Sequence, residues 1–215
     1  MDLHIPFPTA VRQYMDTDET LWARMVSFFI SPPIVWGVWA YPVALHFAST
    51  PTRGIISASI FTGLICILPL ILVAYRVKIG KIGDLHMRES NERYIPLGTA
   101  VFCSMIAWFL LNRFGSHPIM PLMAIIGGLQ LFLVLVATFF NHVSVHAMAI
   151  TSVTTATSFV YGFSVSLYLV PMILLVALAR LVLNRHTPAQ IMAGALIGVL
   201  TPIAVIAVSP LFTSF

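Results

Sequence analysis

The sequence predicts an all-α fold, a polytopic bundle of six to seven transmembrane helices, and three observations carry this prediction. Hydrophobic residues make up 59% of the 215 residues and charged residues only 8%, whereas soluble domains have roughly 45–50% and about 25%. Apolar runs of roughly 20 residues, the length at which a helix crosses about 30 Å of hydrocarbon, recur along the chain. In lipid an isolated strand could not satisfy its backbone hydrogen bonds, so each run is predicted to be a helix.

The predicted segments follow one another in short succession. In order, they are 25–48, 54–76, 96–112, 119–140, 146–162, 165–183 and 188–211. The first contains Ser-Pro-Pro, which predicts a kinked or partial helix and leaves six full spans as the alternative. A charged loop follows the second segment, and the polar run NHVSVHA separates the fourth segment from the fifth. A tight turn near Gly162 separates the fifth segment from the sixth. The seventh follows the polar run NRHTPAQ.

Two regions are expected. Residues 1–24 are predicted to form an interfacial or soluble lead-in, either a helix along the membrane surface or a poorly ordered tail. This stretch carries acids before the first apolar run and lacks the basic n-region of a cleavable signal peptide. Residues 25–215 are predicted to form a single transmembrane helical domain.

The distribution of acidic residues excludes several kinds of site. All seven Asp and Glu residues lie at or before Glu92, so the rest of the chain cannot supply the paired carboxylates of a glycosidase or a carboxylate-bridged metal pair. The sequence has no HExxH, phosphate-loop or dinucleotide-binding pattern. Cys66 and Cys103 fall within predicted spans without metal-ligand spacing. We therefore expect no metal, no cofactor and no nucleic-acid partner.

The polar residues gather in three connections: 76–96, 141–147 and 179–190. Each connection follows an even number of predicted crossings, so all three are expected on the same face of the membrane. The opposite connections contribute only Arg53 and Arg113 of the eleven basic residues. By the positive-inside tendency, the face with the three clusters is predicted to be cytoplasmic, in the cell inner membrane.

Basic residues and histidines that meet at the membrane boundary predict a phosphate site, because arginine binds phosphate oxygens bidentately and histidine can attack or protonate near neutral pH. The run Thr187-Pro-Ala-Gln190 has the form of a capping box at the start of the last helix. His186 would then lie just outside a helix N-terminus, where an anion is stabilised. A membrane location implies that the phosphate belongs to a lipid.

These residues resemble the motifs of the type 2 phosphatidic acid phosphatase superfamily. The run from Ala179 to Gln190, with Arg180 and His186 at the matching positions, resembles the third motif, SRxxxxxHxxxD. VSVH at 143–146 resembles the second, PSGH, and the loop 76–96 resembles the first, KxxxxxxRP. The three motifs have the family's order and spacing and organise residues 76–190, more than half of the chain.

The resemblance implies a role for each matching residue, without a metal ion. His186 would attack phosphorus, and His146 would protonate the leaving oxygen. Arg180 would bind phosphate, and Ser144 would lend a hydroxyl or a backbone N–H. For the first motif two registers are possible, Lys81 with Arg88 or His86 with Arg93, and we keep Lys81, Arg88 and Arg93 as phosphate-binding candidates with Arg93 ranked first.

The chain also departs from the family's pattern. Ala179 replaces the serine of the third motif, and Val143 and Val145 replace the proline and glycine of the second. Gln190 stands where the family has the aspartate that orients the nucleophilic histidine. An amide oxygen can accept a hydrogen bond from His186 Nδ1 but cannot stabilise the imidazolium, and in serine proteases the analogous change costs about 10⁴ in rate. Three outcomes stay open: a slow enzyme, a substitute acid such as Asp84 or Glu92, or lost catalysis.

Two functions follow as expectations. The first is a membrane lipid phosphatase that hydrolyses a phosphatidate or a polyprenyl (di)phosphate through a phosphohistidine. The alternative is a non-catalytic protein of the same fold that binds lipid phosphate or serves as a subunit of a complex with membrane-protein partners. Arg88 and Arg93 could also simply bind anionic headgroups. The run Gly194–Gly198, GALIG, is predicted to be a small-xxx-small helix contact.

Overall fold

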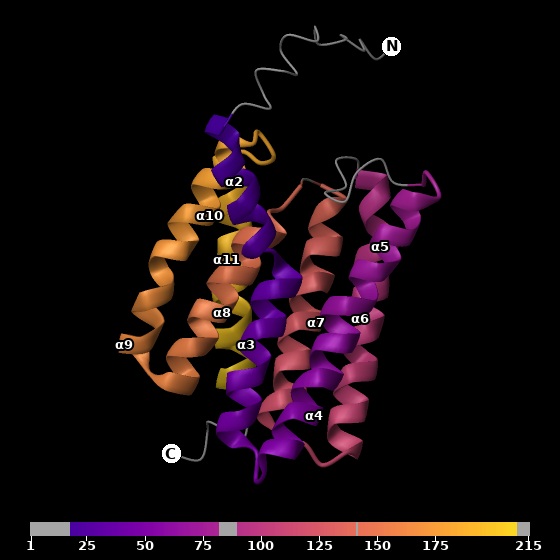
Figure 1. Ribbon diagram of the computed structural model, residues 1–215, viewed down its shortest axis with the longest axis vertical. Coiled ribbons are helices and arrows are strands. Elements are labelled where there is room, and N and C mark those ends of the chain that lie inside the picture. Colours follow the sequence, from indigo (N-terminus) through magenta and orange to yellow (C-terminus); the bar gives the residue numbers. More distant parts are fainter. Residues whose placement is uncertain (1–17, 82–89, 141, 210–215) are drawn as a thin grey trace, which may run out of the picture.

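The computed structural model describes residues 18–81, 90–140 and 142–209, and every regular element in these ranges is helical (Figure 1). The all-α prediction is therefore confirmed. The helices are, in chain order, α2 (Asp18–Phe29), α3 (Pro32–Phe47), α4 (Pro51–Phe61), α5 (Leu68–Lys78), α6 (Ser90–Arg113), α7 (Ile119–Thr138), α8 (Val145–Tyr161), α9 (Phe163–Ser166), α10 (Val170–Val182) and α11 (Pro188–Ala207). A π-helical turn, η1 (Thr62–Ile67), joins α4 to α5, and a 3₁₀ turn, η2 (Leu167–Leu169), joins α9 to α10.

Within the described ranges, five helical stretches are long and apolar enough to cross a membrane. They are Pro51–Lys78, Glu92–Arg113, Ile119–Thr138, Phe163–Val182 and Pro188–Ala207. The pair formed by α2 and α3 would make a sixth, bent by 45°. Helix α8 has 17 residues, which extend over only roughly 25 Å at 1.5 Å per residue, less than the hydrocarbon thickness. The structure thus supports five to six spans, and the predicted count of six to seven is not confirmed.

The kink predicted at Ser-Pro-Pro is present. Helix α2 ends at Phe29, and α3 begins with Pro32 and Pro33, which cannot donate backbone hydrogen bonds to a preceding turn. Of the two residues between α2 and α3, Ser31 is extended (φ −75°, ψ 150°). The expected boundary at residue 24 falls inside α2, because this helix begins at Asp18 and packs along α10 with Ala23 and Ser27 buried.

The core lies where α3 packs against α4, α7 and α8. Trp36 and Trp39 of α3 are buried against each other and against Phe61 of α4. The indole Nε1 of Trp39 donates to Thr157 Oγ1 of α8 at 3.0 Å, so its polar end is satisfied inside the bundle. Many large apolar side chains on the outer faces are exposed, as expected for helices that face lipid rather than water.

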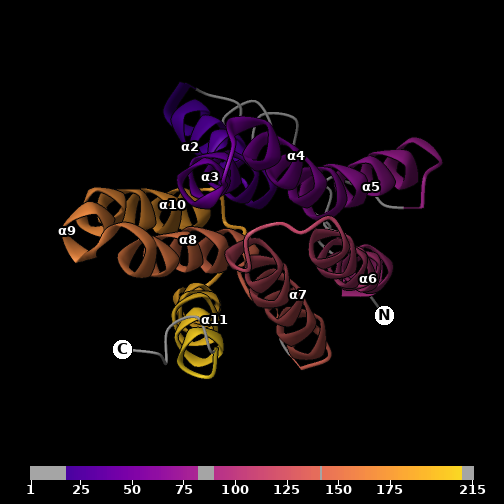
Figure 2. The same cartoon turned by 90° about the horizontal axis from the view of Figure 1, so that it is seen from below.

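Helix α8 packs against α3, α10 and α11 (Figure 2). Its contact with α11 is close because α11 presents Gly194 and Gly198 to it. A Cβ atom at Gly194 would collide with the carbonyl oxygen of Ser144, and one at Gly198 would collide with Thr151 Oγ1 and the Met148 carbonyl. The small-xxx-small contact predicted for GALIG is confirmed, and it fixes the start of α8 beside the start of α11.

One end of the bundle collects the helix ends that carry the polar clusters. The starts of α2, α6, α8 and α11 and the ends of α5, α7 and α10 lie together at this end, which we call the histidine end (Figure 1). The connections α3–α4 and α6–α7 lie at the other end, which we call the opposite end. The second and third family-like motifs and the start of α6 are therefore neighbours in space.

Candidate functional site

The start of α11 has the predicted capping box. Thr187 Oγ1 accepts from the Gln190 backbone N–H at 3.4 Å, and Gln190 Oε1 accepts from the Thr187 backbone N–H at 3.1 Å. Pro188 occupies the first turn, where a missing N–H costs nothing. This box fixes the direction in which the chain enters α11 and places His186 immediately outside it.

The His186 side chain is held by the same glutamine. Its Nδ1 lies 3.3 Å from Gln190 Oε1, and because an amide oxygen only accepts, Nδ1 must carry the hydrogen. In the neutral ring the lone pair then belongs to Nε2. Burial, followed by the charges of Arg180 and Arg93, lowers the pKa of His186 to about 4, while the Gln190 hydrogen bond opposes this shift. The ring is therefore neutral at pH 7, with a nucleophilic Nε2.

Two buried arginines from different helices act on His186. Arg180, in the last turn of α10, is 3% exposed, and Arg93, in the first turns of α6, is 9% exposed. Both charges disfavour protonation of the imidazole, which places both guanidinium groups within electrostatic reach of it. Arg180 also donates to Ser27 Oγ of α2 at 3.4 Å. A pair of buried cations beside a neutral histidine suits an anion with several oxygens.

Ser144 joins the second family-like motif to the third. Its backbone N–H donates to the Gln190 carbonyl at 3.1 Å, and its side chain, fully buried, caps α8 by accepting from the Ala147 N–H at 3.4 Å. Since both its N–H and its hydroxyl oxygen take part in these contacts, Ser144 locks the two helix starts together. Ser144 is thus placed to position the site rather than to present an N–H to a ligand.

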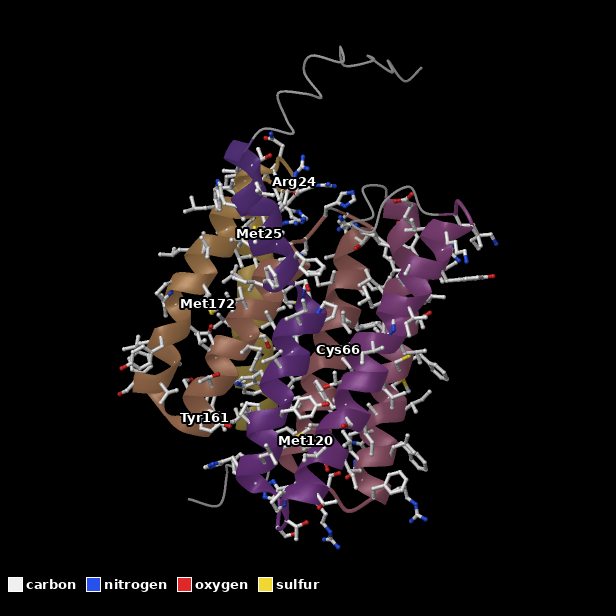
Figure 3. The ribbon with its side chains drawn as sticks, in the orientation of Figure 1. Arg24, Met25, Cys66, Met120, Tyr161 and Met172 are labelled. Carbon is white, nitrogen blue, oxygen red and sulfur yellow. The ribbon has the colours of Figure 1, made fainter. Side chains whose placement is uncertain are left out.

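His146 is turned toward α2. Its Nε2 lies 3.1 Å from the backbone oxygen of Ser27, and because a carbonyl only accepts, Nε2 donates. Ser27 is buried, and it contacts both residues: its hydroxyl oxygen accepts from Arg180, and its backbone oxygen accepts from His146. No pattern in the sequence singles out Ser27, because a serine in an apolar helix is common and its partners lie more than a hundred residues away. Figure 3 shows Arg24, one turn earlier in α2, at the same end of the bundle.

His142, from the second cluster, acts on His186 electrostatically. It precedes α8 and is partly buried. The resemblance to the second family motif pointed to His146 instead. The signal that could have pointed to His142 is its position in the connection before α8, from which a side chain can reach toward α11. The site therefore has two histidines beside the one assigned as nucleophile.

Of the phosphate-binding candidates from the first family-like motif, Lys81 and Arg93 lie in different places. Arg93 belongs to the site, whereas Lys81 is exposed beyond the end of α5, where its backbone N–H bonds to the Arg76 carbonyl at 2.9 Å. Arg88, together with Asp84 and His86, lies outside the described residues. The structure thus brings together Arg93, Arg180, Ser144, His186 and Gln190 and leaves Lys81 at the periphery.

Chemically, this arrangement can bind a phosphoryl group and offer it a neutral imidazole nitrogen. Within the described ranges, no group of three or more His, Cys, Asp or Glu side chains lies close enough to hold a metal ion. Comparison with protein-family models, with curated proteins and with solved structures finds no match for this chain.

Proposed function

We propose that this protein is a membrane lipid phosphatase of the type 2 phosphatidic acid phosphatase kind, which hydrolyses a phosphatidate or a polyprenyl (di)phosphate through a phosphohistidine. The observation that carries the proposal is the state of His186: neutral, with its hydrogen on Nδ1 and flanked by two buried arginines. A general anion-binding patch would not need to hold a histidine neutral. A nucleophile must be unprotonated to attack.

In the proposed reaction, Arg93 and Arg180 bind the phosphoryl oxygens and neutralise the charge that develops on them. His186 Nε2 attacks phosphorus, the bond between phosphorus and the lipid oxygen breaks, and the leaving oxygen takes a proton from a second histidine. Water then gives a proton to the second histidine and attacks phosphorus, the N–P bond breaks, and inorganic phosphate leaves. The phosphorylated imidazole retains its hydrogen bond from Nδ1 to Gln190 Oε1 throughout.

Two histidines are candidates for the proton donor. The family resemblance assigns this role to His146, whose Nε2 donates to Ser27. His142 acts electrostatically on His186, which makes it the other candidate. His142→Ala and His146→Ala separate them, because loss of the proton donor slows formation of the phosphohistidine by roughly 10²–10⁴, whereas loss of a packing histidine lowers stability instead.

With a glutamine at position 190, we expect the enzyme to turn over slowly. The amide holds the correct tautomer of His186, but it supplies no negative charge when the imidazole becomes cationic as the N–P bond forms. This neutral partner is also the observation that favours the second candidate function, a non-catalytic protein that binds a lipid phosphate in the same site or presents it to a membrane-protein partner.

The test is release of phosphate by the detergent-purified full chain, with EDTA present, from farnesyl diphosphate, undecaprenyl diphosphate and phosphatidic acid. We expect slow release by the wild type, none by His186→Ala, and wild-type release by His46→Ala, a matched control at the opposite end. Binding of these lipids by a folded wild type without any release would favour the non-catalytic candidate. Release that persists in His186→Ala would overturn the histidine mechanism.

A further inference from the structure

A cavity with polar lining lies at the opposite end of the bundle, away from His186. It has a volume of about 440 Å³, within the range of small-molecule sites. Its walls come from the end of α3, the start of α4 and the α6–α7 connection. Met120, a buried residue of the lining, is labelled near this end in Figure 3.

Several side chains that line this cavity can donate hydrogen bonds. Arg53 of α4 contributes a guanidinium group, which always carries its charge. His117 Nδ1 accepts from the Ile119 backbone N–H at 3.3 Å, so in the neutral ring the hydrogen is on Nε2, which can only donate. The hydroxyl oxygens of Ser57 and Ser116 lie 2.7 Å apart. Whichever of them accepts in this pair retains its own hydrogen for another acceptor.

No acidic side chain balances these donors in the sequence around the cavity. None of the seven Asp and Glu residues lies in the connections at 48–51, 114–118 or 162. The cavity that Arg53 lines therefore has no carboxylate from these connections. The ligand chemistry that matches it is an anion with several oxygens, such as a phosphate.

The rim of the cavity is apolar. Ile56 is 50% exposed and Phe114 is 67% exposed, and both line the cavity. The ring of Phe47 stacks on His117, with centroids 4.9 Å apart and an angle of 18° between the planes. Arg53 and His117 are exposed beside these apolar side chains. Polar donors next to exposed apolar side chains, at a helix end where headgroups lie, fit a molecule that has a phosphate and an apolar tail.

We infer that this cavity binds the phosphate of an anionic amphiphile through Arg53, His117 and the Ser57–Ser116 hydroxyl pair, on the membrane face opposite to the histidine site. This binding site is independent of the proposed hydrolysis. The same donors would accept a free phosphate ion, so the experiment separates the lipid headgroup from the free ion.

The test uses native mass spectrometry in detergent with dihexanoyl phosphatidic acid, on the full chain carrying His186→Ala so that the bound lipid is not hydrolysed. We expect two bound lipids per His186→Ala chain, one when Arg53→Gln is added, one when Arg180→Gln is added, and two when Arg113→Gln is added. Arg113 is the matched control, because it also lies at this end, in the last turn of α6, and does not line the cavity. Arg53→Gln is expected to weaken binding at this site by about 10- to 100-fold.

Further arms identify the source of the phosphate. Displacement of the cavity-bound lipid by inorganic phosphate would show that the free ion is a sufficient ligand, and retention would show that the site selects the lipid. Equal binding of dihexanoyl phosphatidylcholine, or an equal loss in Arg53→Gln and Arg113→Gln, would overturn the inference. If Arg53→Gln does not fold, Arg53→Lys takes its place. The lysine keeps the positive charge but cannot bind phosphate with two parallel N–H groups, so we expect weaker binding than with arginine. Unchanged affinity in a folded Arg53→Lys would also count against the site.

If the proposed phosphatase site is wrong but the cavity site is right, the His186→Ala chain would bind one lipid with or without Arg180→Gln, and none with Arg53→Gln. If the cavity site is wrong, adding Arg53→Gln to the His186→Ala chain would leave the number of bound lipids unchanged.

Discussion

At the residue scale, the behaviour of the candidate site depends on how one imidazole is held. Gln190 accepts hydrogen bonds from both His186 Nδ1 and the Thr187 backbone N–H, so a residue that caps a helix also sets the tautomer of the neighbouring histidine. Burial and two arginines then keep this histidine neutral. Both effects come from neighbours rather than from the histidine, and each can be changed separately by a single substitution.

The first prediction concerns the pH dependence of activity. His186 must be neutral to attack, and its pKa in the folded protein is about 4, so the decrease in kcat/KM caused by protonation of the nucleophile should occur near pH 4 and not near pH 6.5. Measurement of kcat/KM between pH 3.5 and about 8 with farnesyl diphosphate checks this. An acid limb near the ordinary histidine pKa of about 6.5 would contradict it.

The same lowered pKa makes stability depend on pH. Below about 6.5 the unfolded chain binds a proton at His186, whereas the folded chain does not until about 4. The unfolded state therefore binds more protons in this window, and the free energy of unfolding should fall as the pH is lowered from 6.5 to 4. Thermal unfolding in detergent over this window should show the decline, and His186→Gln should flatten it.

The substitution Gln190→Asp introduces the negative charge that the family resemblance predicts beside His186. In Gln190→Asp, a carboxylate beside His186 would stabilise the imidazolium, so kcat should rise by ten-fold or more, with about 10⁴ as the ceiling. The acid limb of kcat/KM should also move up from about 4, because a negative charge raises the pKa of a histidine. Gln190→Asn is the matched control, with the same length as Asp and no charge. Equal rates for the two variants would exclude a role for charge at this position.

At the element scale, the close packing of α8 on α11 carries the second and third clusters to the same place. Gly194 and Gly198 allow backbone contact between the two helices, and the Ser144 N–H donates to the Gln190 carbonyl at 3.1 Å across this contact. The break at Pro32 and Pro33 between α2 and α3 allows α2 to pack against α10, where Ser27 contacts Arg180 and His146. The site therefore depends on two helix contacts that do not themselves touch a ligand.

Gly198→Ala tests the first of these contacts. The added methyl group would collide with Thr151 Oγ1 and the backbone carbonyl of Met148, so we expect a loss of about 1–3 kcal/mol in the free energy of unfolding. Gly98→Ala in α6 is the matched control: a methyl group added there would have no neighbouring atom within 4 Å, and alanine is the better helix former. Thermal unfolding in detergent compares them, and equal melting temperatures would show that the close packing is dispensable.

At the scale of the whole molecule, the bundle separates two groups of cations along its length. Arg93 and Arg180 lie at the histidine end, and Arg53 and Arg113 lie at the opposite end, while the helices between them bury an apolar core that includes Trp36, Trp39 and Phe61. If the bundle spans a membrane as its apolar helices indicate, the two ends face different compartments.

Single cysteines at the two ends test this orientation. In a background where Cys66 and Cys103 are replaced by Ala, Arg185→Cys at the histidine end and Arg113→Cys at the opposite end should react with a membrane-impermeant maleimide from opposite sides. By the positive-inside tendency we expect Arg185→Cys to be labelled only after the cells are opened. Labelling of both from the same side would contradict the arrangement.

Four features of the fold could be predicted from the order of residues alone: the all-helical class, the kink at Ser-Pro-Pro, the capping box of α11 and the small-residue contact at Gly194–Gly198. These are local or periodic features, because the lipid environment requires helices and because caps, prolines and small residues act on their own neighbours. The family-like spacing also pointed to Arg180, His186 and Gln190 as one group.

Which polar groups meet became clear only from the packing of the helices. This packing places Arg93 rather than Lys81 with His186, turns His146 toward Ser27 and brings His142 into electrostatic reach of His186. It also forms the cavity around Arg53 from three separate stretches of chain. The apolar pattern of each helix specifies that it is buried in lipid or protein, but the rotation of one helix against another comes from packing between residues far apart in the sequence, and that rotation sets the direction of every polar side chain.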